Sequence, residues 1–504
     1  MSTEVELKYL TLSDDVSAKV FSLLKERELS FSHNVKHLSN CYFDTAELAL
    51  RHLDMGLRIR ICGSHIEQTI KTVGIVIGGL HQRPEYNVDI TSSFPELALF
   101  PTEIWPNSED AQRLQAQLIP LFNTDFTRET WLITLENSVI ELAFDQGSIS
   151  SSGRSIDICE LELELVSGDK HGLFTLAQYL FNAISLRPGT QSKAARGYRL
   201  FFNKQQIEEL EPELDLHSNA ENIEACFVDG VNHCLSQIQT AVDQYLANKS
   251  LLKLAEFVDV LALLRQGFWL FDDKLTAQSL EIRNELSYFI QLFAWVDSAI
   301  YFKELMTKTG NYRKKLDYSE QLIEQLKLEK RRFPDKEMVT ELLHSERFNL
   351  LLLALLRFIT SNHHQQYFVN STQAPLIPFA KKKLSESLAL LTNAMSKLTT
   401  LDAEQYLAQR KLLHRSLLTG NWFGCFFDEK QRSDYRMPLQ DIQTGLRELQ
   451  SLWIIKQQLE KIELINESNN KKILDWQESK VENLLIALTH SKNLAISLPA
   501  YWLA

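Results

Sequence analysis

The sequence contains few cysteines and no long hydrophobic run, and each absence excludes a class of protein. The six cysteines in 504 residues are scattered without the spacing of a zinc site or of a disulfide framework. They are interpreted as buried thiols of a reducing compartment. The longest apolar run, residues 350–356, ends at Arg357 and is much too short to span a bilayer. Because the first ten residues also lack the basic and apolar regions of a secretory signal, we expect a cytoplasmic protein with no membrane partner.

An excess of positive charge is missing as well. The chain carries 53 lysines and arginines against 65 aspartates and glutamates, and its formal net charge is −12. This balance argues against a nucleic-acid partner, although it leaves room for local basic sites. A length of 504 residues exceeds the size of a single ordinary core, so two or more domains are expected.

Polar and apolar residues alternate with a period of two through much of the first 200 residues. Glu4, Glu6 and Lys8 alternate with apolar residues at positions 5, 7 and 9, as in a β-strand with one charged and one apolar face. Comparable patterns predict strands at residues 35–43, 55–61, 66–73, 82–90, 126–135, 139–145 and 156–166. Antiparallel strands at hairpin spacing predict a closed barrel or a strongly curved sheet.

The charged faces of these strands are sorted by sign. The acidic rows are Glu4 with Glu6, and Glu160 with Glu162 and Glu164; the basic positions are Arg58 with Arg60, then Lys71, Arg83 and Arg128. Like charges along one strand face repel each other. Clustered carboxylates favour Mg²⁺ or Mn²⁺, and clustered guanidinium groups favour phosphates. A metal–polyphosphate complex would satisfy both sets, whereas the simpler alternative is that the rows are solvated faces of unrelated strands.

The second half of the chain changes to helical periodicity. Residues 204–220 are polar and acidic and contain Pro212, which predicts a linker between domains at 1–203 and 220–504. Beyond the linker, helices are predicted at residues 221–246, 251–271, 280–303, 319–331, 338–359, 380–398, 403–418, 439–465 and 470–490. An all-α domain of one or two bundles is therefore expected.

A set of motifs in residues 1–203 resembles a known family. The set consists of Glu4-x-Glu6-x-Lys8, HLDMGLRIR (52–60), GGLHQRPEYNV (78–88), PTEIWPN (101–107), FNTDFTRETWL (122–132), ICELELEL (158–165) and SKAARGY (192–198). It resembles the CYTH superfamily of triphosphate tunnel metalloenzymes, and most of all the bacterial inorganic triphosphatases that join a CYTH domain to a C-terminal CHAD domain. The resemblance implies an α+β protein whose N-terminal eight-stranded antiparallel barrel hydrolyses inorganic triphosphate (tripolyphosphate) with Mg²⁺ or Mn²⁺.

The resemblance also implies residue roles. The metal ligands it suggests are Glu4 and Glu6 with Glu162 and Glu164, and Asp145 is a further candidate. Glu160 shares the face of Glu162 and Glu164, so which two of these three bind the metal stays open. The catalytic and phosphate-binding cations are Lys8, Arg58, Arg60, Lys71, Arg128 and Lys193, followed by Arg83, Glu85 and Arg196 as second-rank site residues. Arg196 has the alternative role of a structural partner for a carboxylate, and Tyr198 that of a packing residue. The five histidines between residues 33 and 81 are interpreted as surface or structural residues.

Other functions stay open within the same resemblance. CYTH relatives include adenylate cyclases and thiamine-triphosphatases, although no base-reading motif is evident in this chain. A non-enzymatic polyphosphate-binding protein is the third alternative. CHAD relatives bind polyphosphate through basic residues and histidines, but here that signature is reduced to Arg410, Lys411, His414 and Arg415. Polyphosphate as a partner of the helical half is therefore an open hypothesis.

Overall fold

The fold is known from a computed structural model that describes residues 2–11, 13, 15–107, 110–203, 216–361, 366–369, 374–396, 400–462 and 468–503. The chain divides into two compact units, one made of Met1–Ile207 with Thr340–Arg357 and one made of Glu208–Val339 with Phe358–Ala504. Most of the predicted linker, residues 204–215, lies outside the described residues. The predicted domain limits stay a prediction, and the assignment of residues 340–357 to the first unit was not expected from the sequence.

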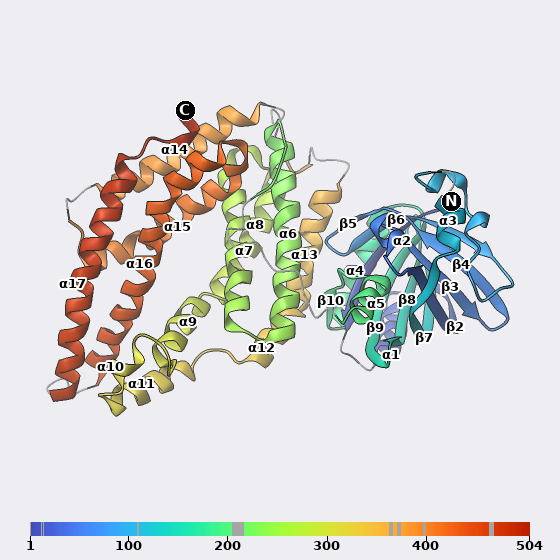
Figure 1. Cartoon of the computed structure of the whole chain (residues 1–504), viewed down its shortest axis with the longest axis horizontal. Helices are drawn as coiled ribbons and strands as arrows, with labels where there is room; N and C mark the ends of the chain where they lie inside the picture. Colours follow the sequence, from blue (N-terminus) through green and yellow to red (C-terminus); the bar gives the residue numbers. More distant parts are fainter. Residues whose placement is uncertain are drawn as a thin grey trace. The chain divides into compact units, whose positions relative to one another are not determined.

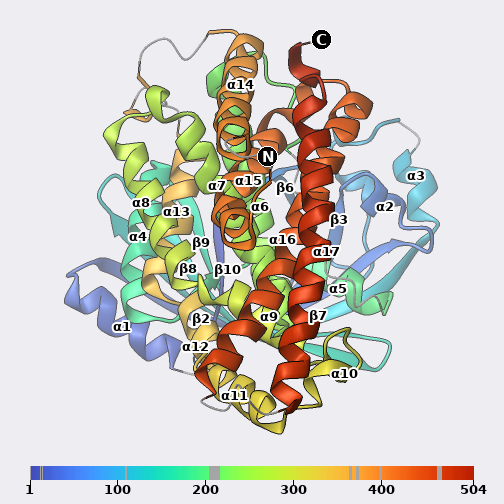
Figure 2. The ribbon, with the colours of Figure 1, turned by 90° about the vertical axis from the view of Figure 1, so that its left-hand side faces the viewer.

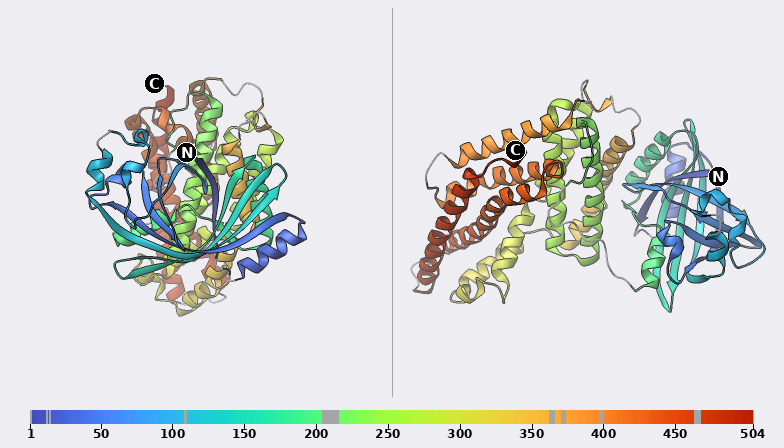
Figure 3. Two further views of the ribbon diagram at one scale, coloured as in Figure 1. Left: turned by 90° about the vertical axis from the view of Figure 1, so that its right-hand side faces the viewer. Right: turned by 45° about the horizontal axis from the view of Figure 1, so that its top comes forward.

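The first unit is built on a closed antiparallel barrel (Figure 1 and the left view of Figure 3). Pairing between β1 and β6 closes the ring β1-β9-β8-β7-β2-β3-β4-β6, so the predicted eight-stranded barrel is confirmed. Its strands are β1 (Ser2–Thr11), β2 (Ser30–Thr45), β3 (Gly56–Cys62), β4 (His65–Lys71), β6 (Leu80–Asp89), β7 (Leu118–Leu135), β8 (Ser138–Ser151) and β9 (Arg154–Ser167). Two short strands extend the ring, because β5 (Ile75–Ile77) pairs with β6 and β10 (Leu186–Pro188) pairs with β1.

Alternation along the strands gives this barrel a charged interior and an apolar exterior. In β1, Leu7 and Tyr9 are buried on the outer face, and Glu4, Glu6 and Lys8 point the other way. Helices cover the apolar exterior: the Tyr9 ring lies 5.2 Å from the ring of Phe181. The helices and turns of this unit are α1 (Val16–Glu26), α2 (Ala49–His52), η1 (Leu97–Leu99), η2 (Thr102–Ile104), α3 (Asp110–Gln115), α4 (Lys170–Ala183) and α5 (Lys193–Phe201).

The second unit is helical throughout its described residues, as the sequence predicts, apart from two isolated β-bridges. Its helices are α6 (Ile223–Asn248), α7 (Leu251–Leu270), α8 (Ala277–Leu292), α9 (Trp295–Met306), α10 (Arg313–Leu316), α11 (Glu320–Lys330), α14 (Leu376–Met395), α15 (Ala403–Phe423), α16 (Glu429–Lys461) and α17 (Ser468–Ser497), with short turns η3 (Asp272–Lys274), η5 (Gly424–Phe426) and η6 (Tyr501–Leu503). Figure 2 shows α16 and α17 side by side. Close packing around the buried Trp422 requires two glycines, because a Cβ on Gly230 or Gly267 would lie 2.1 or 2.0 Å from its ring.

Two predicted helices are each divided in two. Residues 280–303 form α8 and α9, and residues 338–359 form α12 (Lys336–Leu343) and α13 (Glu346–Thr360). At the second break the Ser345 hydroxyl accepts a hydrogen bond from the Phe348 amide at 3.3 Å, as a residue that caps a new helix does. The predicted helix ends at 398 and 465 lie outside the described residues. No described helix is long and apolar enough to cross a membrane.

Candidate active site in the barrel lumen

The barrel encloses a charged cavity of about 290 Å³. Its lining includes most of the predicted site residues, namely Glu4, Glu6, Lys8, Arg58, Arg60, Lys71, Arg83, Glu85, Arg128, Glu162, Glu164 and Lys193. Asp145, Glu160 and Arg196 are not part of the lining. All but one of the lining residues in this set come from strands, and Lys193 comes from the first position of α5, directly after its capping residue Ser192.

Strand register decides which charges meet. Lys8 of β1 lies opposite Glu162 of β9, so this cation faces a carboxylate. Glu6, two residues earlier, lies opposite Glu164, and Glu164 lies opposite Glu141 of β8. One level of the lumen therefore has a matched ion pair, and the next has three carboxylates side by side on adjacent strands.

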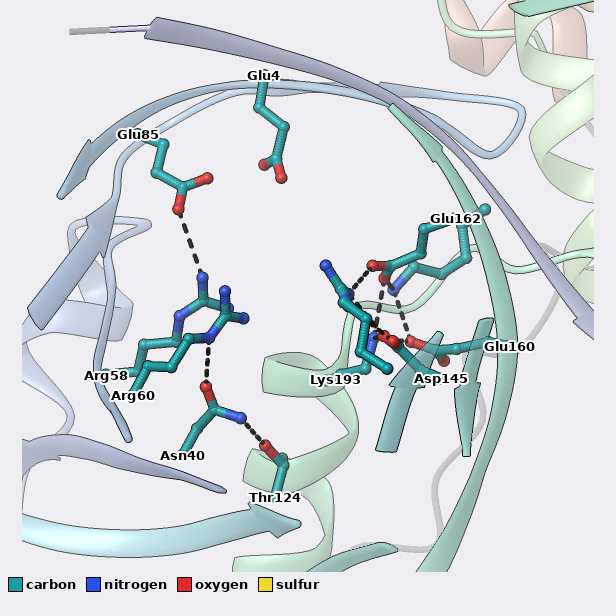
Figure 4. A network of polar contacts seen from close by, with 12 residues as sticks. Glu4, Asn40, Arg58, Arg60, Glu85, Thr124, Asp145, Glu160, Glu162 and Lys193 are labelled. Atoms are coloured by element: carbon teal, nitrogen blue, oxygen red, sulfur yellow. Dashed lines mark hydrogen bonds and ion pairs between the residues drawn. The ribbon is translucent and has the colours of Figure 1, made fainter. Parts of the chain in front are cut away.

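The matched level is centred on Glu162. Its Oε1 lies 2.7 Å from the Lys8 ammonium and 2.9 Å from that of Lys193, and its Oε2 lies 2.5 Å from Nη2 of Arg128. Burial alone would raise the pKa of the Glu162 carboxyl, but Lys193, Lys8 and Arg128 hold this pKa well below its usual range. Figure 4 shows Glu162 and Lys193 together at one wall of the lumen.

Asp145 and Glu160 complete this ion network behind the lumen wall, and both side chains are fully buried. Arg128 donates to both oxygens of Asp145, at 2.7 and 2.6 Å, and Lys193 contacts both carboxylates. Arg196 donates to Glu160 at 3.1 Å and to the Asp157 carbonyl, which is the contact pattern of a structural partner. Asp145, Glu160 and Glu162 are close enough together to hold a metal ion, but basic side chains already occupy their oxygens.

At the level of Glu6, Glu141 and Glu164, the carboxylates lack the cations that surround Glu162. Burial and the neighbouring Glu4, Glu6 and Glu141 raise the pKa of the Glu164 carboxyl from 4.5 to about 7. The pKa of Glu4 is also raised, chiefly by burial, although Lys71 contacts its carboxylate. Within the described part of the chain, Glu6, Glu141 and Glu164 form no ion pair. This level therefore has a deficit of positive charge.

A surplus of positive charge lies across the lumen on β3, which is four places from β9 in the eight-stranded ring. Burial and the charges of Arg58 and Arg128 lower the pKa of Arg60 from 12.5 to about 10. The Arg60 Nε donates to Oδ1 of Asn40 at 2.9 Å rather than to a carboxylate. Arg58 donates to Glu85 at 3.4 Å. Burial alone would lower the pKa of Arg58, but Tyr42 and Glu85 raise it above its usual value. The two arginines are visible opposite Glu162 in Figure 4.

The cavity lining also contains residues that the sequence did not predict as site residues, among them Glu141, Asn40 and His81. Glu141 was predictable, because it lies four residues before Asp145 on the same face of β8. Asn40 accepts a hydrogen bond from Arg60 and donates one to Thr124 at 2.9 Å. Because Asn40 is uncharged, the pattern of charges along the strands did not indicate it. His81, for which the sequence predicts a surface or structural role, lines the cavity with 4% of its surface exposed.

Outside the lumen, Tyr198 donates its hydroxyl hydrogen to Asp44 at 2.9 Å, so it does not cap the tunnel. In the helical unit, Arg410 donates to the Tyr301 hydroxyl at 3.0 Å and to Asp297 at 3.3 Å. Burial lowers the pKa of His414. Polyphosphate binding by this unit stays a prediction.

Comparison with protein families agrees with this architecture. Residues 2–198 match the CYTH domain and residues 230–460 match the CHAD domain. The chain therefore contains a CYTH domain followed by a CHAD domain. Among curated proteins it is 37% identical over 205 residues to the inorganic triphosphatase of Haemophilus influenzae. That match covers 40% of this chain and 55% of the relative, so the chain spans about half the length of the curated protein it matches.

Two solved structures are also similar to parts of the chain. One is a protein from Hippeastrum described as an adenylyl cyclase candidate with a dominant triphosphatase activity, at 18% identity and a TM-score of 0.31, covering 42% of this chain and 98% of that one. The other is the CHAD domain from the plant Ricinus communis, at 14% identity and a TM-score of 0.40, covering 58% of this chain and 98% of that one.

Proposed function

We propose that the barrel hydrolyses inorganic triphosphate to diphosphate and phosphate with Mg²⁺ or Mn²⁺. The observation that carries the proposal is a pair of opposite charge imbalances in one cavity. Carboxylates around Glu164 lack a cation, and across from them Arg60 donates to Asn40 rather than to a carboxylate. Each imbalance is costly when buried. A divalent cation and a polyanion, bound together, would offset both.

The residues present fit a hard divalent cation. Glu4, Glu6 and Glu164 would hold it, with Glu141 beside them, because carboxylate oxygens are the preferred ligands of Mg²⁺ and Mn²⁺. When bound, such an ion supplies charge stabilisation on phosphate oxygens and lowers the pKa of a water molecule. The metal-ligand roles predicted for Asp145 and Glu160 are not favoured by this proposal, since their oxygens already contact Lys193 and Arg128 or Arg196.

The cations of the lumen would bind the substrate. Arg58 and Arg60 present guanidinium groups that match phosphate geometry. Lys71, Arg83 and Arg128 lie on other strands of the same cavity, so contacts to a triphosphate would come from several sides. Phosphoryl transfer is catalysed mainly by positioning and charge stabilisation, and these groups would stabilise the negative charge that develops on the leaving diphosphate.

The size of the cavity favours a compact substrate. A volume of about 290 Å³ lies just below the range of roughly 300–1,000 Å³ typical of ligand pockets. A bare triphosphate therefore suits the lumen better than a triphosphate that carries a nucleoside or a thiamine.

Phosphate release by the full chain tests the proposal. Tripolyphosphate, ATP and thiamine triphosphate are compared with Mg²⁺, with Mn²⁺ and with EDTA. We expect metal-dependent release that is fastest from tripolyphosphate and absent in EDTA. Equal or faster turnover of ATP, or cyclic AMP as a product, would instead assign the lumen to an organic triphosphate. Binding of polyphosphate without hydrolysis of any substrate would identify a non-enzymatic protein.

A further inference from the structure

A helix from the CHAD part of the sequence is built into the barrel unit. Residues 340–357 fall within the CHAD match but pack with the first unit. Within this segment Asn349 of α13 is 1% exposed. Its side-chain amide donates to the Leu186 carbonyl at 2.7 Å, and also to the carbonyls of Ser345 at 3.0 Å and His344 at 3.3 Å. Asn349 thus ties α13 to the start of β10.

β10 lies directly beside Lys8. It pairs with β1 through Tyr9–Pro188 and Leu10–Arg187, and the amide that follows it, Gly189 N–H, donates to the Lys8 carbonyl at 2.9 Å. A Cβ at Gly189 would lie 2.9 Å from Lys8 Cγ, so the backbone at this position packs against the Lys8 side chain. Because β10 has only three residues, its placement depends on contacts outside the ladder.

The same segment leads to Lys193. Four residues after Gly189, Lys193 begins α5, where the Ser192 hydroxyl caps the helix by accepting from the Ala195 amide at 3.1 Å. The ammonium groups of Lys8 and Lys193 both contact Glu162 and Glu160. The Leu186 carbonyl therefore lies at one end of a short stretch of chain whose other end delivers a cation into the lumen.

We propose that Asn349 is a positioning residue for Lys8 and Lys193. By fixing β10, it sets the position of the backbone that packs on Lys8 and that leads into α5. A helix of the CHAD half thereby helps to shape the charged lumen of the CYTH half. The kinetic consequence of this role rests on the proposed hydrolysis, but the structural consequence does not.

Arg357 provides a matched control on the same helix. Its guanidinium donates to the Gln178 side chain at 3.1 Å and lies 5.5 Å from the Phe174 ring, both on α4. The variant Arg357→Met therefore weakens the attachment of α13 to the barrel without touching the Leu186 carbonyl.

Amine labelling of the full chain tests the proposal independently of activity. Lys8 and Lys193 are 2% and 7% exposed, and their carboxylate partners hold their pKa values above the usual range despite burial, so both should react slowly with an amine-selective reagent. In Asn349→Ala we expect their labelling rates, measured by peptide mass spectrometry, to rise about fivefold or more relative to Lys71. Arg357→Met should leave this ratio unchanged.

Turnover supplies the second readout. If the chain hydrolyses tripolyphosphate, Asn349→Ala should lower kcat/KM by roughly tenfold to a hundredfold, as expected for small displacements of catalytic groups, and Arg357→Met should not. A chain without hydrolysis but with the labelling change would refute the proposed function and keep the positioning role. Unchanged labelling in a folded Asn349→Ala variant, or equal changes in both variants, would overturn it. Should Asn349→Ala fail to fold by circular dichroism, Asn349→Ser is read by the same criteria.

Discussion

At the scale of single residues, the lumen separates charges that neutralise each other from charges that do not. Glu162 is surrounded by Lys8, Lys193 and Arg128, so its charge is neutralised within the barrel. Burial and like charges raise the pKa of Glu164 and lower the pKa of Arg60, and both shifts favour the neutral form. Perturbed pKa values of this kind are typical of functional sites. Here the perturbed acid and the perturbed base face each other across one cavity.

The first prediction concerns Glu164→Gln. The substitution removes a proposed metal ligand, so hydrolysis should fall on the order of a hundredfold. It also removes a carboxylate that is unfavourable in the metal-free barrel. Since the folded-state pKa is about 7 against an ordinary 4.5, the gain in unfolding free energy in EDTA above pH 7 should approach about 3 kcal/mol.

The sign of the pH dependence follows from proton linkage. Between pH 4.5 and 7 the folded parent chain binds more protons at Glu164 than the unfolded chain does, so its stability falls as the pH rises. Glu164→Gln should match the parent near pH 4 and exceed it above pH 7, as measured by thermal unfolding in EDTA. The exposed Glu103→Gln serves as the control and should change neither property. Lower stability of Glu164→Gln at pH 8 would show that the carboxylate is already neutralised.

The second prediction separates the two charge imbalances by their response to metal. Glu6→Ala weakens the proposed metal site, so excess Mg²⁺ should restore part of its activity. Arg60→Ala removes a phosphate contact, typically worth about 3 kcal/mol in the transition state, and added metal should not help. Rates are measured over a range of metal concentrations, with surface Arg113→Ala as the control. Near-parental activity of both variants would mean that the charged faces of the barrel are merely solvated.

At the scale of elements, the strands were predictable and their register was not. Period-two alternation placed Glu160, Glu162 and Glu164 on one face of one strand, and the structure agrees. Alternation does not reveal which residue of a strand 150 positions earlier lies opposite each of them. The register puts Lys8 opposite Glu162 and Glu6 opposite Glu164. This difference separates a structural ion pair from a candidate metal ligand.

Helix boundaries show the same dependence on context. Apolar periodicity continues through residues 338–359, but the Ser345 cap divides that stretch into α12 and α13. The helix predicted at residues 439–465 begins earlier in the structure, because α16 starts at Glu429 and contains Pro438. That residues 340–357 join the barrel unit depends on contacts distant in sequence, which periodicity does not encode.

The third prediction concerns the attachment of α5, the helix that carries Lys193. The fully buried Asp44 accepts backbone hydrogen bonds from Thr45, Leu50 and Arg51 and one from the Tyr198 hydroxyl. Asp44→Asn replaces one acceptor oxygen with an NH2 donor that would face these donors, and it should lower the unfolding free energy by about 3 kcal/mol, whereas Tyr198→Phe removes one bond and should cost about 1 kcal/mol. Chemical denaturation measures both. The control Tyr179→Phe should leave the unfolding free energy unchanged. Equal costs for Asp44→Asn and Tyr198→Phe would contradict the expectation that the Asp44 carboxylate matters more than the single Tyr198 bond.

At the scale of the whole molecule, the division between the halves does not follow the order of the chain. All proposed lumen residues precede residue 200, and the domain limits of 1–203 and 220–504 stay a prediction. However, α13 supplies the barrel unit with Asn349 and with the buried Phe348 and Leu352. The fragment 1–203 should therefore contain the chemistry without part of its supporting structure.

The last prediction tests this division with fragments. Fragment 1–203 should keep its strands by circular dichroism and release phosphate from tripolyphosphate with Mg²⁺, but more slowly than the full chain. Its unfolding midpoint should be about 5 °C lower, since a loss of 1 kcal/mol shifts a unit of this size by roughly 2–4 °C and more than one contact is lost. A peptide of residues 336–360 added in trans should restore midpoint and rate together, because it returns the donor to the Leu186 carbonyl and the apolar surface of α13. The same peptide with Asn349→Ala should restore less. Full stability and activity of the fragment without any peptide would show that α13 only rests on the barrel, and the lumen would then be complete within residues 1–203.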